Sequence, residues 1–235
     1  MSDIKVVVKA FRAIDNPDIC EKYVEGHVRV LKIYGITMIT SANVEWFTDP
    51  YTYVILVESE DEQKIYGGAR IQVAGGQYEL PIEKAVKDFD PNVHGLVNRL
   101  TPGGTGELCG LWNSREVAGL GIGSIYLGRV GVAISTQLNL STLFALCAPA
   151  TVKNCMRVGF LVETSLGNNG TFYYPKEDLI ATAVLLNDVP TLINADPDER
   201  QAIINLRENP IQTRIDMAPK QRTLEIDYRI KIPNI

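Results

Sequence analysis

The chain has 235 residues, 46% of them hydrophobic, which suffices for one large core or two modest domains. Its net charge of -5, with lysines and arginines scattered, argues against a nucleic-acid partner. No stretch approaches the roughly 20 apolar residues of a membrane helix, and the first residues lack signal-peptide features, so we expect a cytoplasmic protein without a membrane span. With only two histidines and no CxxC pair, we expect no metal site and reduced cysteines.

Strand and helix patterns alternate along the chain. Runs of β-branched and aromatic residues predict strands, and apolar residues at helical spacing, opened by Pro and closed by Gly, predict helices. In chain order, we expect a strand at 4–14, a helix at 16–35, a hairpin of strands at 51–58 and 64–73, a short helix at 81–87 within an inserted segment at 74–104, a strand at 107–112, a helix at 121–138, a strand at 141–147, a short helix at 149–158, strands at 160–164 and 180–186, a helix at 196–209 and a strand at 223–232.

This alternation predicts an α/β (α+β) fold. We expect one domain at 1–188 and a C-terminal extension of helix plus strand at 189–235. The final strand alternates apolar and polar residues, so one of its faces must be buried. The extension therefore docks either on its own domain or on a partner subunit, as in a homodimer.

A glycine-rich turn follows the strand at 107–112 and leads into a helix. It consists of Gly119, Leu120, Gly121, Ile122, Gly123 and Ser124. The first amides of a helix have no internal partners, the helix dipole favours an anion there, and glycine lets a diphosphate approach the backbone. The turn is neither a G-x-G-x-x-G nor a Walker A loop. It indicates a phosphate site, although glycines that merely clear space for a helix on a sheet give the same pattern.

The order of elements from Glu107 to Phe160 resembles the GNAT superfamily of N-acyltransferases. The phosphate loop of that family has a basic residue or Gln, then two residues, Gly, one residue, and Gly or Ala. Here these positions hold Ala118, Gly121 and Gly123, so the glycines match and the first position departs. The resemblance implies a central mixed, mostly antiparallel twisted sheet flanked by helices, with a splayed parallel strand pair that binds the donor.

The resemblance also implies a reaction. An acyl group would pass from acyl-CoA, a cosubstrate, to an amine acceptor by direct attack. The residues implied to bind the donor are Leu111, Trp112, Asn154 and the turn at 119–124. Glu107 is our candidate general base, and a carboxylate in solvent is the alternative. Cys155, where the family often carries a tyrosine, is our candidate acid, and an inert packed thiol is the alternative.

The first half of the chain looks like the acyl-homoserine-lactone synthase branch of the same superfamily. A strand that carries Arg70 leads into a glycine-rich turn, and Trp46 and Asp49 echo the aromatic and acidic positions of that branch. The usual Glu-x-x-Arg of the branch is absent, since Gly110 stands three residues after Glu107. The resemblance implies a donor longer than acetyl, with Arg70 and Trp46 as substrate-binding residues.

Two other functions stay open. A GNAT-fold protein that has lost catalysis would serve as a ligand-binding or assembly module, and the lack of a tyrosine at position 155 and of a basic residue at Ala118 keep this alternative. An autoinducer-type synthase would take its acyl group from an acyl-carrier protein. Carrier proteins are acidic, so that synthase needs a basic docking face, which a net charge of -5 does not indicate.

Overall fold

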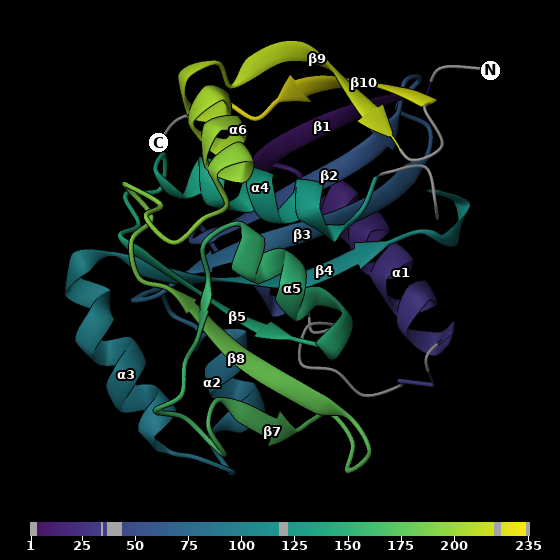
Figure 1. Cartoon of the computed structure of the whole chain (residues 1–235). Helices are drawn as coiled ribbons and strands as arrows, with labels where there is room; N and C mark the ends of the chain where they lie inside the picture. Colours follow the sequence, from purple (N-terminus) through teal and green to yellow (C-terminus); the bar gives the residue numbers. More distant parts are fainter. Residues whose placement is uncertain (1–3, 34, 37–43, 118–121, 219–221, 234–235) are drawn as a thin grey trace.

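The computed structural model describes residues 4–33, 35–36, 44–117, 122–218 and 222–233 (Figure 1). The helices are α1 (Pro17–Ile33), α2 (Pro81–Val86), α3 (Asn92–Leu100), α4 (Ser124–Ser135), α5 (Pro149–Arg157) and α6 (Pro197–Glu208). The strands are β1 (Ile4–Arg12), β2 (Thr52–Ser59), β3 (Ile65–Val73), β4 (Thr105–Asn113), β5 (Thr142–Cys147), β6 (Leu161–Val162), β7 (Thr171–Tyr173), β8 (Ile180–Leu186), β9 (Ile211–Ala218) and β10 (Arg222–Arg229).

All of these strands belong to one sheet. Its order is β6-β8-β5-β4-β3-β2-β1-β10-β9, and β7 pairs with β8. The β4–β5 and β1–β10 pairs are parallel, and the other strand pairs of the described chain are antiparallel. The mixed, mostly antiparallel sheet expected from the sequence is therefore confirmed, as are the β2–β3 hairpin and the parallel β4–β5 pair.

Helices cover both faces of the sheet, because its strands bury side chains on both sides. Along β2, Ile55 points into the core beneath α4, α5 and α6, while the neighbouring Leu56 packs with α1. Along β5, Leu143 faces α4, α5 and α6, and Phe144 faces α2 and α3. This alternation is the period of two that a pleated strand imposes. Figure 1 shows α4, α5 and α6 in front of the sheet and α2 behind it.

The C-terminal extension joins the same sheet. Strand β10 pairs in parallel with β1, and β9 adds to β10 as the outer strand (Figure 1). Helix α6 contacts α4, and its buried Glu199 accepts from Arg129 at 2.9 Å and from Arg157 at 2.6 Å. The extension thus docks on its own chain through a sheet ladder and a buried ion-pair network.

Several elements differ from the expectation. The helix expected at 121–138 is shorter, since α4 spans Ser124–Ser135. Strands β7 and β9 and helix α3 were not expected. The sequence carries a strand signal at β9 that the prediction overlooked, since Ile211, Ile215 and Met217 alternate with polar residues. In the structure these three side chains are 66%, 67% and 70% exposed.

Candidate active site

The parallel pair β4–β5 opens partway along its length. Thr105, Gly106 and Glu107 pair with Thr142, Leu143 and Phe144, and the pairing ends there. Beyond that point β4 pairs only with β3, its neighbour along the whole strand, and the register there is irregular: Arg70 faces Cys109 and Gly68 faces Trp112. The three residue-to-residue steps from Cys109 to Trp112 on β4 thus lie opposite only two steps, Gly68 to Arg70, on β3. One extra residue on one strand is the definition of a β-bulge.

Gly110 lies at this bulge. Its φ is +60°, in the left-handed region that favours glycine. A Cβ there would lie 2.5 Å from the Tyr23 hydroxyl, which donates a hydrogen bond to the Gly110 carbonyl oxygen. A bulge bends the strand that carries it, and this one lies where β4 and β5 stop pairing.

A cavity of about 210 Å³ lies between the splayed strands. Leu108 to Leu111 of β4 form one wall, and Ala145 to Cys147 of β5 with Thr151 and Cys155 of α5 form the other. A second cavity of about 560 Å³ shares Leu111 and Leu146 with the first and continues to the β7–β8 hairpin, with mainly apolar walls. The two cavities form one slot between the strands and a wider apolar chamber beside it.

Helix α1 contributes two aromatic residues to this region. Tyr23 is fully buried, and His27, one turn later, lines both cavities. His27 Nδ1 has no hydrogen-bond partner in the described structure. Burial, together with the nearby Arg70 charge, lowers the pKa of His27 to about 4, so the imidazole is neutral at pH 7. No sequence motif contains His27, and its only signal is its place on the apolar face of the predicted helix.

Glu107 lies inside the protein, at the last position of β4 that pairs with β5. It is 2% exposed, and its Oε2 accepts a hydrogen bond from the Ile82 backbone N–H at 2.6 Å. Burial raises the pKa of this carboxyl to about 8, against the opposing effects of that hydrogen bond and of Arg70. The alternative of a solvated carboxylate is thereby wrong, and a carboxyl with a pKa near neutrality is what proton transfer requires.

Arg70 is a buried cation next to Glu107. Its Nε lies 3.1 Å from Cys109 Sγ, and its guanidinium stacks 4.7 Å from the Trp46 ring centroid. Its Nη1 has no hydrogen-bond partner among the described residues. None of the ion pairs formed by the described part of the chain includes Arg70. The two predicted substrate residues, Arg70 and Trp46, therefore lie together, and the Arg70 guanidinium can still donate a hydrogen bond from Nη1.

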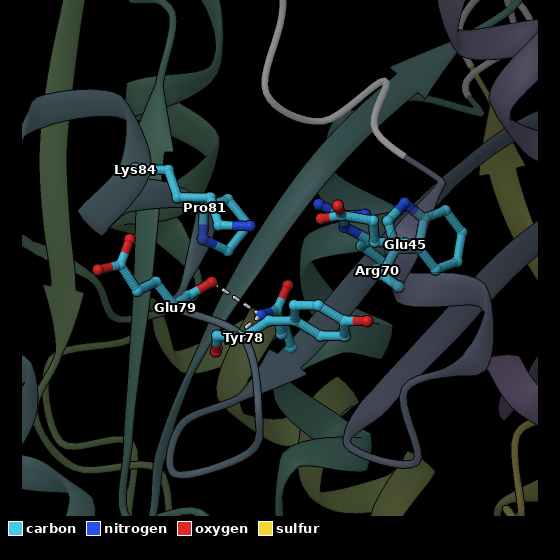
Figure 2. Close-up of a pocket in the computed structure, with 8 residues that line it drawn as sticks. Glu45, Arg70, Tyr78, Glu79, Pro81 and Lys84 are labelled. Carbon is cyan, nitrogen blue, oxygen red and sulfur yellow. Dashed lines mark hydrogen bonds between the residues drawn. The ribbon is translucent and has the colours of Figure 1, made fainter.

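Arg70 and Trp46 line a narrow pocket of about 20 Å³ (Figure 2). Figure 2 shows Arg70 and Glu45 on one side of the pocket and Glu79, Pro81 and Lys84 on the other. The floor is fixed by Gln72, whose amide donates to the Glu79 carbonyl at 3.0 Å. A fixed floor and a stacked guanidinium form a polar pocket that is held in place before any ligand arrives.

The remaining predicted donor residues are spread around the cavities. Leu111 lines both cavities, and the buried Trp112 lines the larger one. Cys155 lines the slot, and Asn154 precedes it on α5 without lining either cavity. Leu111 and Cys155 therefore line the slot, and Asn154 does not.

The glycine-rich turn is described only in part. Gly119, Leu120 and Gly121 lie outside the described residues. Ile122 is buried in the core, and Gly123, in an extended conformation, precedes the first residue of α4, Ser124. A Cβ at Gly123 would meet nothing within 4 Å. The phosphate site therefore stays a prediction.

No group of three or more His, Cys, Asp and Glu in the described residues is arranged to hold a metal ion. None of the described helices is long and apolar enough to cross a membrane.

Comparisons by sequence find no relative: no family model matches the chain, and no curated protein does. Comparison of structures finds many similar proteins, among them the following three. An N-acyl amino acid synthase, FeeM, from uncultured soil microbes has a TM-score of 0.59 and 14% identity over 83% of this chain and 97% of its own. The chain has the GNAT fold. A CoA-dependent acyl-homoserine lactone synthase, BjaI, solved with SAM and isopentyl-CoA, has a TM-score of 0.52 and 11% identity over 98% of this chain and 95% of its own. An acyl-CoA N-acyltransferase from Pseudomonas aeruginosa has a TM-score of 0.52 and 11% identity over 77% of this chain and 98% of its own.

These neighbours confirm the fold that the sequence resemblance implied, including its similarity to the acyl-homoserine-lactone synthase branch of the GNAT proteins. The resemblance covered residues 107–160 best, whereas the GNAT-fold neighbours align with most of the chain. The motif region thus identified the fold, but the resemblance does not cover β9 and β10, which belong to the same sheet.

Proposed function

We propose that this protein is an acyltransferase that moves an acyl group from a CoA thioester to an amine acceptor. The observation that carries the proposal is the slot between β4 and β5. Strand β4 has no partner on its β5 side after Glu107, and a cavity of about 210 Å³ fills the gap. Two of the fold neighbours are named for CoA-dependent or acyl-CoA chemistry, which agrees with a CoA donor.

The slot suits the pantetheine arm of CoA. Backbone groups of residues 108–111 have no ladder partner on β5, and buried backbone groups require hydrogen bonds. A chain that carries amides can pair with them as an added strand would. The pyrophosphate would then lie at the turn at 119–124, where helix amides favour an anion.

The larger cavity suits an acyl chain longer than acetyl. Its volume is about 560 Å³, and its walls include Val30, Leu31, Trp112 and Ile180. Each buried methylene contributes about 0.8 kcal/mol to binding. Donor affinity should therefore rise with chain length until the chamber is full.

We assign the carboxylate of the acceptor to the guanidinium of Arg70, beside which the pocket of about 20 Å³ must widen to admit it. A buried guanidinium with an unpaired Nη1 favours an anion, and a carboxylate can accept two parallel hydrogen bonds from it. An α-amino acid offers both this carboxylate and the attacking amine. The name of the neighbour FeeM, an N-acyl amino acid synthase, agrees with this acceptor class.

The reaction we propose is a single displacement. The acceptor amine attacks the thioester carbon, its proton passes to Glu107, and the C–S bond breaks. The CoA thiolate leaves and takes a proton, for which Cys155 in the slot is the candidate donor. Because burial raises the pKa of Glu107 to about 8, its ionised form is a stronger base than an ordinary carboxylate.

The C-terminal extension offers a surface to a second copy of the chain. Strand β9 is the outer strand, and Ile211, Ile215 and Met217 point outward. Antiparallel pairing of two β9 strands about Ile215 would set Arg214 of each copy opposite Asp216 of the other. We propose that the chain forms this homodimer.

We also propose that the protein is located in the cytoplasm, because its four cysteines are free and buried.

The test is an acyl-transfer assay. Wild-type protein is mixed with acyl-CoA esters of increasing length and a panel of amines with and without a carboxylate, and released CoA thiol is measured. We expect turnover with a carboxylate-bearing amine and a longer acyl chain. Glu107→Gln should lower the rate by about 10²–10⁴ with little change in CoA affinity.

Two results would redirect the proposal. CoA binding without turnover for any amine would make the protein a ligand-binding module. Turnover from an acyl-carrier protein, with none from acyl-CoA, would make it a carrier-dependent synthase.

A further inference from the structure

Two thiols meet in the slot. Cys147 is the last residue of β5, Cys155 lies on α5, and their Sγ atoms are 3.3 Å apart. They are 5% and 7% exposed, both are free, and both line the cavity of about 210 Å³. The pair is therefore enclosed by protein yet faces the space that we assign to the donor.

The two thiols differ in acidity because they share one hydrogen bond. The hydrogen bond with Cys155, together with burial, raises the pKa of Cys147 well above its usual range. The same hydrogen bond lowers the pKa of Cys155. Cys155 is thus the member that ionises first, and the thiolate is the reactive form of cysteine.

We propose that Cys147 and Cys155 are an oxidation site, at which a peroxide that enters the slot converts the two thiols into a disulfide. The Cys155 thiolate attacks a peroxide oxygen, the O–O bond breaks, and a sulfenic acid and water (or an alcohol) result. The Cys147 sulfur then attacks the sulfenic sulfur and its hydroxyl leaves as a second water. The two thiols are oxidised and the peroxide is reduced.

The geometry demands little movement. A disulfide bond is about 2.05 Å long, so sulfur atoms now 3.3 Å apart must approach by about 1.2 Å. Cys155 lies in the last turn of α5, and Cys147 ends β5, where it pairs with Thr182 of β8. A small shift of α5 toward β5 suffices.

The other two cysteines differ from this pair. Burial raises the pKa of Cys20 to about 12, and its thiol lies 3.6 Å from the Ala13 carbonyl oxygen. Burial raises the pKa of Cys109 to about 11, and its sulfur is held by Arg70 Nε at 3.1 Å. Both should stay thiols under conditions that oxidise Cys147 and Cys155.

A donor in the slot would cover both sulfur atoms. Oxidation should therefore be fast in the free protein and slow in the CoA-bound protein. This protection rests on the proposed function, whereas disulfide formation rests on the pair alone.

The experiment treats wild-type protein with hydrogen peroxide, blocks remaining thiols by alkylation, and maps peptides without reduction. We expect a loss of two hydrogen atoms and a peptide pair cross-linked through Cys147 and Cys155, reversed by a dithiol reductant. Saturating CoA should slow the cross-link by at least about tenfold. Cys155→Ala should abolish the cross-link, and the matched Cys20→Ala should leave its rate unchanged.

The results of this experiment distinguish the oxidation site from the proposed donor slot. Wild-type protein that keeps its thiols, goes only to sulfinic acid, or cross-links another pair would overturn the oxidation site, whatever the variants do. A correct cross-link that CoA does not slow, in protein that binds no CoA, would uphold the oxidation site and count against the proposed donor slot.

Discussion

Replacing Glu107 by Gln removes a carboxyl that is costly to ionise inside the protein. Burial raises its pKa from 4.5 to about 8, so between these values the unfolded chain has released a proton that the folded chain still holds. The unfolded state then binds fewer protons, and the free energy of unfolding must fall as pH rises through this window and level off above it. Gln has no proton to lose, and its side-chain oxygen can still accept from the Ile82 N–H.

The magnitude follows from the shift. One pKa unit corresponds to about 1.4 kcal/mol, so the full window gives an upper bound of about 5 kcal/mol. Local relaxation around a buried charge lowers this value, and we expect a gain of about 2–3 kcal/mol for Glu107→Gln over wild type between pH 5 and pH 8.

Urea unfolding at a series of pH values measures this difference directly. The exposed Glu60→Gln is the matched control, because it makes the same chemical change at the surface. A Glu107→Gln advantage that grows from pH 5 to pH 8 beyond that of Glu60→Gln supports the reasoning. An advantage that stays constant with pH would refute the buried, neutral carboxyl.

Four further variants test the packing, the donor turn and the outer strand. Gly26→Ala should destabilise the fold by roughly 1–3 kcal/mol in urea unfolding, because its Cβ would lie 2.1 Å from the Trp112 ring. Gly95→Ala, also in a helix but facing open space, should be neutral or stabilising, and equal losses would contradict the packing. Gly121→Asp should weaken CoA binding at least about tenfold in calorimetry, and an unchanged affinity would remove the phosphate site. Ile215→Lys should convert dimer to monomer in light scattering, and a wild-type monomer would exclude the pairing.

The strands and helices that the sequence predicted best have local signals. The β2–β3 hairpin has β-branched runs on both sides of a polar turn, and the unit from β4 through α4 to β5 contains the glycine-rich turn. Strand β9 alternates apolar and polar residues as a strand does, and this short signal after α6 was overlooked. Helix α3 carries Val93, Leu96 and Val97 at helical spacing, a signal that the short-helix interpretation of the inserted segment overlooked.

The site was less predictable because it depends on contacts between distant segments. Glu107 and Arg70 were named through the family resemblance, and their burial and closeness come from the β3–β4 ladder. The bulge at Gly110 needs Tyr23, which is 87 residues away in sequence. The meeting of Cys147 with Cys155 depends on how α5 folds back on β5. No local sequence pattern indicates which distant residues will be in contact.

The central claim is that the slot between β4 and β5 holds the pantetheine arm of CoA. Calorimetric titration of CoA into wild-type protein, Ala145→Leu and Ala202→Leu tests it most directly. Ala145 is a wall of the slot, and Ala202 lies on α6, away from it. We predict that wild type and Ala202→Leu bind CoA equally and that Ala145→Leu binds at least about tenfold more weakly, because the added carbons fill the slot. Equal CoA affinity for all three proteins would contradict the claim.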